Sequence, residues 1–268
     1  MNMTSVLIAT LTVGGIGLLI GILLTVLGKV LAVVTDERTE NIAAALPGVN
    51  CGACGYAGCN ACAKAIADGE AAVDACPVGG AATAAIIADI MGVSVEKGGR
   101  KVAFVHCSGN CAQAPLTAQY TGEADCHAAK LAGGSGRACE FGCYGLGSCV
   151  SACPFDAIHL EDRLAKVDKD ACKACGKCVN ACPQHIISLE PVDAVAEIAC
   201  SSREKGKTVM SICKSGCIGC GLCARSCPTG SITIVDNLPI IDQSTCVRCS
   251  VCVDKCPRKI IRFDYPVN

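Results

Sequence analysis

Cysteine is the residue type in this sequence whose number and spacing point to chemistry. The chain has 26 Cys among 268 residues, about one residue in ten. Cysteines at this density serve as disulfides in an oxidising compartment, as zinc ligands, or as ligands of iron–sulfur clusters, which take four thiolates each. The spacing of the cysteines discriminates among these three chemistries.

The pattern Cys-x2-Cys-x2-Cys-x3-Cys-Pro occurs three times in the second half of the chain. In bacterial ferredoxins, three thiolates of this run bind one cubane and the fourth, before the proline, binds the other cluster of a pair. A zinc ribbon needs only paired Cys-x2-Cys elements, so three complete runs favour 4Fe-4S clusters. The runs are Cys172, Cys175, Cys178 and Cys182; Cys217, Cys220, Cys223 and Cys227; and Cys246, Cys249, Cys252 and Cys256.

This exchange of the fourth cysteine between two runs gives three clusters a complete set of four ligands. Each cluster takes three thiolates from one run and its fourth thiolate from the end of the partner run. The three predicted sets are Cys217, Cys220, Cys223 with Cys256; Cys246, Cys249, Cys252 with Cys227; and Cys172, Cys175, Cys178 with Cys153.

A fourth set lacks one ligand. It contains Cys143, Cys149 and Cys182, but Leu146 occupies the position of the expected second cysteine. An aliphatic side chain cannot bind iron, so either another cysteine replaces it or a three-iron cluster forms. The candidate replacements are Cys111, Cys126 and Cys139, of which Cys139 is favoured because it is nearest in sequence.

Five further cysteines then have no assigned partner. Four of them could hold a sixth cluster between the two halves of the ferredoxin-like region. The alternative is that several are small buried apolar residues, as free cysteines often are. These residues are Cys107, Cys111, Cys126, Cys200 and Cys213.

The N-terminal part carries a different cysteine pattern. Its spacing is Cys51-x2-Cys54-x4-Cys59-x16-Cys76-Pro, which supplies four thiolates at intervals suited to one cluster, and Cys62 is a spare. Glycines between these cysteines leave room for the backbone to wrap a cluster and donate N–H bonds to its sulfurs. The cysteines together predict five or six 4Fe-4S clusters per chain.

An internal repeat indicates the elements that position these cysteines. The intervals ten, nineteen and ten recur from Cys143 to Cys182 and from Cys217 to Cys256. We expect an α+β fold with two tandem ferredoxin-like repeats, residues 93–192 and 193–268, the first carrying nineteen extra residues between Cys107 and Cys139. A small 4Fe-4S domain is expected at residues 35–92. Residues 81–91 read as a short Ala-rich helix, and 101–106 as a strand.

The sequence predicts that residues 1–34 form a membrane anchor. No charged side chain precedes Lys29, and residues 6–28 are dominated by Leu, Ile, Val and Gly. These 23 residues would form a helix of about 34 Å, enough for a bilayer core of about 30 Å. A cleaved signal peptide is the alternative, but the start lacks a basic segment. Because all basic residues follow the helix, the remainder is expected on the cytoplasmic side of the cell inner membrane, where thiols stay reduced.

Composition excludes several other functions. The formal net charge is −1, so no basic excess points to nucleic acid. No nucleotide-binding glycine motif is present, the four His have no metal-ligand spacing, and no nucleophile–base pair is visible, so we predict no catalytic residue. Trp is absent and aromatics are 3%, so cluster ligation is expected to supply much of the folding free energy. The available chemistry is one-electron transfer.

The order of these parts resembles a known family. Residues 46–59, Leu-Pro-Gly-Val-Asn-Cys-Gly-Ala-Cys-Gly-Tyr-Ala-Gly-Cys, followed by Cys76-Pro and the ferredoxin repeats, are similar to the B subunit of the Rnf complex, the ion-translocating ferredoxin:NAD oxidoreductase. The resemblance covers essentially the whole chain. It implies that Cys51, Cys54, Cys59 and Cys76 bind a membrane-proximal cluster.

The resemblance also implies a role and partners. Electrons would pass from soluble ferredoxin to membrane subunits of the same complex, coupled to Na⁺ or H⁺ movement, with flavin and nicotinamide sites on other subunits. This sequence has two double-cluster units where shorter family members have one. Alternatives are a membrane-anchored ferredoxin subunit of another dehydrogenase or hydrogenase, and a redox or iron sensor. A basic cluster formed by Lys255, Arg258, Lys259 and Arg262 is a candidate docking site for an acidic ferredoxin.

Overall fold

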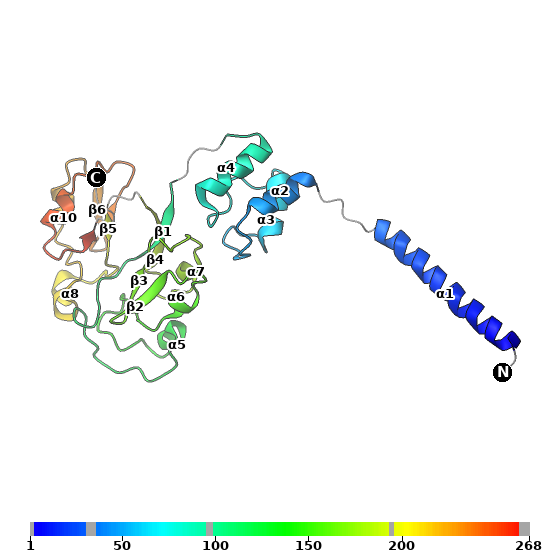
Figure 1. The fold of residues 1–268 in the computed structure, drawn as a ribbon. Helices are drawn as coiled ribbons and strands as arrows, with labels where there is room; N and C mark the ends of the chain where they lie inside the picture. Colours follow the sequence, from blue (N-terminus) through cyan, green and yellow to red (C-terminus); the bar gives the residue numbers. More distant parts are fainter. Residues whose placement is uncertain (1–2, 31–35, 95–98, 193–195, 263–268) are drawn as a thin grey trace.

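A computed structural model of the chain describes residues 3–30, 36–94, 99–192 and 196–262. The first helix, α1 (Met3–Val30), stands apart from the other elements in Figure 1. Its side chains are described at positions 3, 4, 8 and 11–27, and all of these are exposed. Over the described parts of the chain, no helix combines the length and apolarity that crossing a membrane requires.

Three helices form the N-terminal unit. They are α2 (Glu37–Ala45), α3 (Cys59–Ala67) and α4 (Gly80–Met91). The Asp36 side chain caps α2, and Gly92 ends α4 in the left-handed conformation, at a φ of 68°. The predicted helix at 81–91 is thereby confirmed. Apolar side chains that face one another across the helices form the core of this unit: Ile42, Leu46, Cys62, Ala63, Ile66 and Ile87.

The first ferredoxin-like unit is closed by strands from its two ends. Strand β1 (Lys101–Val105) pairs antiparallel with β4 (Ile187–Pro191), which confirms the strand predicted at 101–106. Between them lie the antiparallel pair β2 (Ile158–Glu161) and β3 (Leu164–Val167) and the short helices α6 (Ser148–Ser151) and α7 (Lys177–Asn180). The extra residues of this unit carry α5 (Cys126–Leu131).

The second unit repeats this topology, as Figure 1 shows. Strand β5 (Glu197–Ile198) pairs with β8 (Ile261–Arg262), and β6 (Ile232–Val235) pairs with β7 (Leu238–Ile241). Helix α8 (Gly206–Ile212) precedes α9 (Leu222–Arg225) and α10 (Val251–Lys255). The same pairing of terminal strands around an inner hairpin therefore occurs twice along the chain.

Cysteines form part of the core in both ferredoxin-like units. The first core joins aliphatic residues such as Ile158 and Ile187 to buried Cys143 and Cys172. The second joins Ile260 and Ile261 to cysteines in the same way. Each inner hairpin turns through two residues with positive φ, Asp162-Arg163 and Asp236-Asn237, the conformation that matches the twist of paired strands.

Candidate metal centres

In the second unit the cysteines form two groups. One cavity of about 350 Å³ is lined by Cys217, Cys220, Cys223 and Cys256. Another of about 320 Å³ is lined by Cys227, Cys246, Cys249 and Cys252. The structure therefore brings together both predicted sets, each with three thiols from one run and the fourth from the other.

In the first unit the structure differs from the sequence-based expectation. A cavity of about 330 Å³ is lined by Cys126, Cys143, Cys149 and Cys182. Cys126 therefore lies where Cys139 was favoured. Leu146, at the position equivalent to Cys220, does not line this cavity. Cys139 is nearer in sequence, but it begins a turn in which its carbonyl accepts from Gly142 N. Its thiol lines a separate cavity.

Helix α5 brings Cys126 to this position. Its N-cap is Asp125, whose carboxylate accepts from Ala128 N at 2.8 Å and from the Ser148 hydroxyl at 2.8 Å. The same hydroxyl accepts from Cys126 N at 2.7 Å. Because Ser148 begins α6 and precedes Cys149, these bonds fix Cys126 beside the cysteine loop. The Lys130 ammonium donates to the carbonyl of Pro183 and ties α5 to the segment after Cys182.

The remaining set of the first unit is Cys153, Cys172, Cys175 and Cys178. Cys153 Sγ accepts from Ala157 N at 3.4 Å, and Cys172 Sγ accepts from Ala103 N at 3.4 Å. Burial raises the pKa of the Cys178 thiol to about 11, and the other three cysteines add to the shift. The four thiols therefore share one electrostatic environment.

The four cysteine loops have a common backbone shape. Each has a left-handed residue at the third and at the fifth position of its run. These positions are occupied by Gly145 and Gly147, Ala174 and Gly176, Gly219 and Gly221, and Arg248 and Ser250. Positive φ is costly for residues other than Gly, and its presence at Ala174, Arg248 and Ser250 indicates that the surrounding structure imposes this loop shape.

In the N-terminal unit, Asn50 holds the cysteine loop closed. Its side-chain oxygen accepts from Cys59 N at 2.7 Å, which joins the residue before Cys51 to the start of α3. Burial raises the pKa of the Cys62 thiol to about 12, and a hydrogen bond with Cys54 adds to the shift. Cys54 and Cys59 likewise contribute to the raised pKa of Cys76, after burial. Cys62 thus lies against the predicted ligands while it packs in the helical core.

The unassigned cysteines separate into two classes. Cys107, Cys139, Cys200 and Cys213 line one cavity between the two ferredoxin-like units. Cys111 lies elsewhere, with its N–H donating to Asp162 Oδ2 at 3.1 Å, and it lines none of these four cavities. Cysteine spacing could not show which of these residues lie together, because Cys107 and Cys200 are 93 positions apart in the sequence.

The chemistry of these sites fits iron–sulfur clusters. Burial raises the pKa of several thiols, with values of about 12 for Cys149 and about 11 for Cys217 and Cys252. Such thiols are protonated at neutral pH without metal, so metal binding must release protons. Backbone N–H groups aimed at sulfur stabilise the thiolate that the metal requires. Among the described residues, no group of three His, Cys, Asp or Glu side chains could hold a single metal ion.

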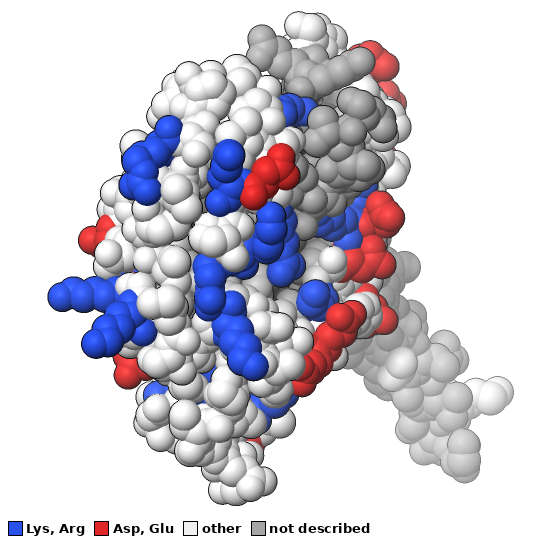
Figure 2. Space-filling model, turned by 90° about the vertical axis from the view of Figure 1, so that its left-hand side faces the viewer, with Lys and Arg blue, Asp and Glu red and all other residues white. Residues whose placement is uncertain are grey.

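Three of the four predicted docking residues form hydrogen bonds within the chain. Arg258 donates to the carbonyls of Cys213 at 2.5 Å and Gly216 at 3.2 Å, and Arg262 donates to the Ser108 hydroxyl at 2.9 Å. The Lys259 ammonium donates to the carbonyl of Asp254 at 3.2 Å, and both Lys255 and Lys259 are exposed. Figure 2, which views the side of the second unit, shows Lys and Arg gathered on that face.

Comparisons with known proteins agree with these features. A family model described as "Putative Fe-S cluster" matches residues 46–78, and one described as "4Fe-4S dicluster domain" matches residues 171–231 and 216–260. The chain is 45% identical to the B subunit of the Na(+)-translocating ferredoxin:NAD(+) oxidoreductase complex of Acetobacterium woodii, over 90% of this chain and 72% of that protein.

Two other relatives carry related names. The B subunit of the ion-translocating oxidoreductase complex of Methanosarcina acetivorans is 39% identical over 90% of this chain and 92% of its own length. The B subunit of the proton-translocating ferredoxin:NAD(+) oxidoreductase complex of Clostridium ljungdahlii is 39% identical over 91% of this chain and 86% of its own. The chain therefore belongs to the family of B subunits of the Rnf complexes, the ion-translocating ferredoxin:NAD oxidoreductases.

Proposed function

We propose that this chain is the electron-transfer subunit of an ion-translocating oxidoreductase complex that transfers electrons from reduced ferredoxin to NAD. The observation that carries the proposal is the grouping of thiols in fours, with two or three from one loop and the others from distant segments. Cubane clusters, when bound, supply one-electron transfer at such sites. The chain's own side chains hold the clusters, bury them and donate hydrogen bonds to sulfur.

Five ligand sets follow from this grouping. Four lie in the ferredoxin-like units and one in the N-terminal unit, with Cys126 in the place that Leu146 leaves without a thiol. Cys62 remains a neighbour of the N-terminal set. The sets are Cys51, Cys54, Cys59 and Cys76; Cys153, Cys172, Cys175 and Cys178; Cys126, Cys143, Cys149 and Cys182; Cys217, Cys220, Cys223 and Cys256; and Cys227, Cys246, Cys249 and Cys252.

The N-terminal set is the proposed exit toward the membrane. Cys51 contributes to the raised pKa of Cys175, whose main cause is burial, so these two sets are electrostatic neighbours. The N-terminal unit also follows directly on α1 in the chain. Electrons that reach the set of Cys175 would therefore leave through Cys51 and its partners to membrane subunits of the complex.

Anchoring by residues 1–34 is part of this proposal. The described large side chains of α1, including Leu11, Leu19 and Leu23, are 70%, 69% and 59% exposed, and they need an apolar environment. Because Lys29 is the first charge, residues 35–92, 93–192 and 193–268 would lie on the cytoplasmic side of the inner membrane. Ferredoxin would approach the basic face of the second unit, where charge complementarity speeds encounter.

Electron delivery through the N-terminal set tests this function. In membranes that contain the assembled complex, Cys54→Ser should leave ferredoxin-driven bleaching of the remaining clusters intact while NAD reduction is lost. Cys111→Ser is the matched control, because Cys111 lines none of the four-thiol cavities. Undiminished NAD reduction by Cys54→Ser would refute the proposed route.

A further inference from the structure

The cavity between the two ferredoxin-like units has the same composition as the cluster sites within them. Cys107 and Cys139 from the first unit and Cys200 and Cys213 from the second line it. Its volume, about 410 Å³, is no smaller than the 350, 330 and 320 Å³ of the other three cavities. Cys139, Cys200 and Cys213 are 8–9% exposed. Four thiols from four separate segments thus line a space comparable with those at the other three cysteine groups.

The backbone around these thiols is arranged to stabilise thiolates. Cys107 Sγ accepts from Cys143 N at 3.5 Å, and Cys200 Sγ accepts from Cys217 N at 3.3 Å. These two bonds are equivalent in the two units, since the second cysteine of each pair begins a cluster-binding loop. A Cβ at Gly109 would lie 3.1 Å from Ala114 Cβ, 3.5 Å from Cys213 Sγ and 3.8 Å from Cys107 Sγ, so this glycine lies beside both sulfurs.

A buried cation in the cavity wall indicates the charge of the ligand. Arg137 is 8% exposed and lines the cavity. Its guanidinium donates to the carbonyls of Gly109, Ala114 and Arg163 at 2.6, 3.2 and 2.7 Å, while its Nε has no hydrogen-bond partner. No carboxylate pairs with it among the described residues. A buried charge without a counter-charge is costly, and a cubane held by four thiolates is an anion.

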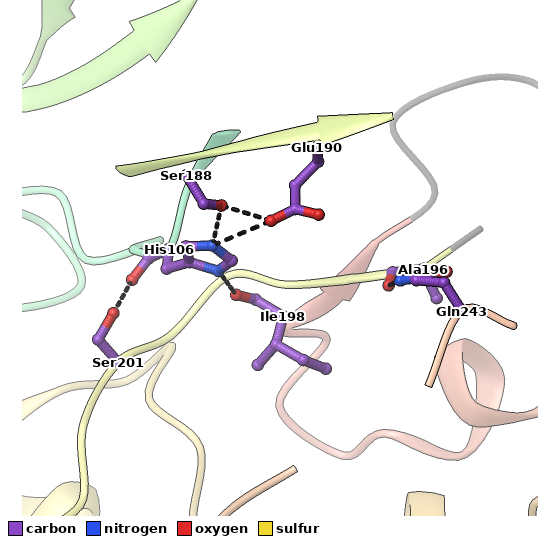
Figure 3. A network of polar contacts seen from close by, with 7 residues as sticks. All are labelled: His106, Ser188, Glu190, Ala196, Ile198, Ser201 and Gln243. Carbon is purple, nitrogen blue, oxygen red and sulfur yellow. Dashed lines mark hydrogen bonds and ion pairs between the residues drawn. The ribbon is translucent and has the colours of Figure 1, made fainter. Parts of the chain in front are cut away.

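Polar contacts hold the four cysteine segments in register across the two units. His106 Nδ1 lies 2.9 Å from the carbonyl O of Ile198, and its Nε2 lies 2.7 Å from Ser188 Oγ. The Ser201 hydroxyl donates to the carbonyl of His106 at 2.7 Å (Figure 3). Since His106 precedes Cys107, and Ile198 and Ser201 flank Cys200, these bonds fix the two cysteines relative to each other. Arg258 holds the carbonyl of Cys213 in the same way.

We propose that Cys107, Cys139, Cys200 and Cys213 bind a sixth 4Fe-4S cluster at the interface between the two ferredoxin-like units. The proposal rests on the proposed function, because it extends the same row of clusters, but its ligands belong to none of the five sets above. Cys111 is excluded from the cluster, and Cys126 is already used in the first unit.

The interface cluster would connect the two units electrically. Cys107 Sγ accepts a hydrogen bond from the backbone N–H of Cys143, a proposed ligand in the first unit. Cys200 Sγ accepts one from the backbone N–H of Cys217, a proposed ligand in the second. An electron moving from the Cys217 set to the Cys143 set would pass through this cluster as a single electron, with no proton or atom transferred. The row would then run without interruption from the last ferredoxin run to the N-terminal unit.

Iron and acid-labile sulfide per chain, measured on protein purified without oxygen, test this site. The full chain should contain about 24 irons, from four irons in each of six clusters. Cys139→Ala and Cys200→Ala should each lose about four irons, or one iron with a new three-iron EPR signal. The double variant should lose no more than four, because both residues serve one cluster. Cys111→Ala is the matched control and should retain all iron.

The outcomes separate this inference from the proposed function. Unchanged iron in Cys139→Ala and Cys200→Ala, with loss of about four irons in Cys220→Ala, would overturn the interface cluster and leave the five-cluster function intact. Loss of one zinc atom with unchanged iron would also overturn it. A misfolded variant would lose iron from several clusters, so the His106→Gln variant is measured as well. It keeps all four thiols, and it should bind the sixth cluster but lose its four irons faster than wild type under a chelator. Equal chelation rates would contradict the positioning role of His106.

Discussion

Gly145 offers a sharp test of how the cysteine loops are built. It lies between Cys143 and Leu146 with a φ of 69°. A Cβ at this position would lie 2.2 Å from the carbonyl O of Arg163 and 2.6 Å from its Cβ, closer than real side chains come. The substitution Gly145→Ala must therefore displace the hairpin turn that covers the loop. The same carbonyl accepts from Arg137 at 2.7 Å, so the displacement extends to the cavity between the units.

The magnitude follows from two separate costs. Left-handed backbone costs a non-Gly residue about 1–2 kcal/mol, and forcing an extra methyl into packed structure costs about 1–3 kcal/mol. Gly145→Ala should therefore destabilise the folded cluster-bound chain by about 2–5 kcal/mol. Gly176→Ala is the matched control, since its φ is 74° but its nearest contact is Leu189 Cδ1 at 3.9 Å. It should cost only the first component, about 1–2 kcal/mol.

The rate at which cluster absorbance is lost in anaerobic denaturant measures this difference. A gap of about 2 kcal/mol corresponds to roughly a 30-fold faster loss for Gly145→Ala, if the contacts break before the unfolding transition state. Gly219→Ala should fall between the two variants, because its Cβ would meet Asn237 O at 3.1 Å. Equal rates for Gly145→Ala and Gly176→Ala would show that backbone conformation, and not the contact with Arg163, determines the cost.

Three further predictions address ligation, docking and folding. Cys126→Ala should lower the iron content by about four per chain, or by one with a three-iron EPR signal, while Leu146→Ala leaves it unchanged, because Cys126 lines the cavity with Cys143 and Leu146 does not. Full iron in Cys126→Ala would contradict the role of Cys126 as a ligand. Lys255→Glu with Lys259→Glu should slow reduction by ferredoxin about threefold to tenfold at low salt and much less at high salt. Stopped-flow absorbance checks this, and an equal slowing at every salt concentration would argue against electrostatic docking. Removal of iron should leave residues 36–262 largely disordered by circular dichroism, since clusters link both cysteine-rich cores, and a cooperative native-like melt of the iron-free chain would refute this.

Sequence patterns were sufficient to predict the parts of the molecule whose chemistry is local. Each ferredoxin run places three cysteines within seven consecutive residues, so one tight loop brings them together whatever the rest of the chain does. Equal cysteine intervals predicted two repeats, and the structure has the same strand pairing twice. The element predictions at 81–91 and 101–106 were also confirmed, because Ala-rich and apolar segments have strong local preferences.

Long-range packing, in contrast, determines how distant cysteines combine. Cys139 is only four residues before Cys143, yet its thiol faces the interface cavity, whereas Cys126 reaches the Cys143 set because the Asp125–Ser148 contact docks α5 on α6. The interface group joins Cys107 to Cys200 across 93 positions, through packing of one unit against the other. Local sequence patterns do not predict such contacts, since the contacts depend on how whole helices and strands pack against one another.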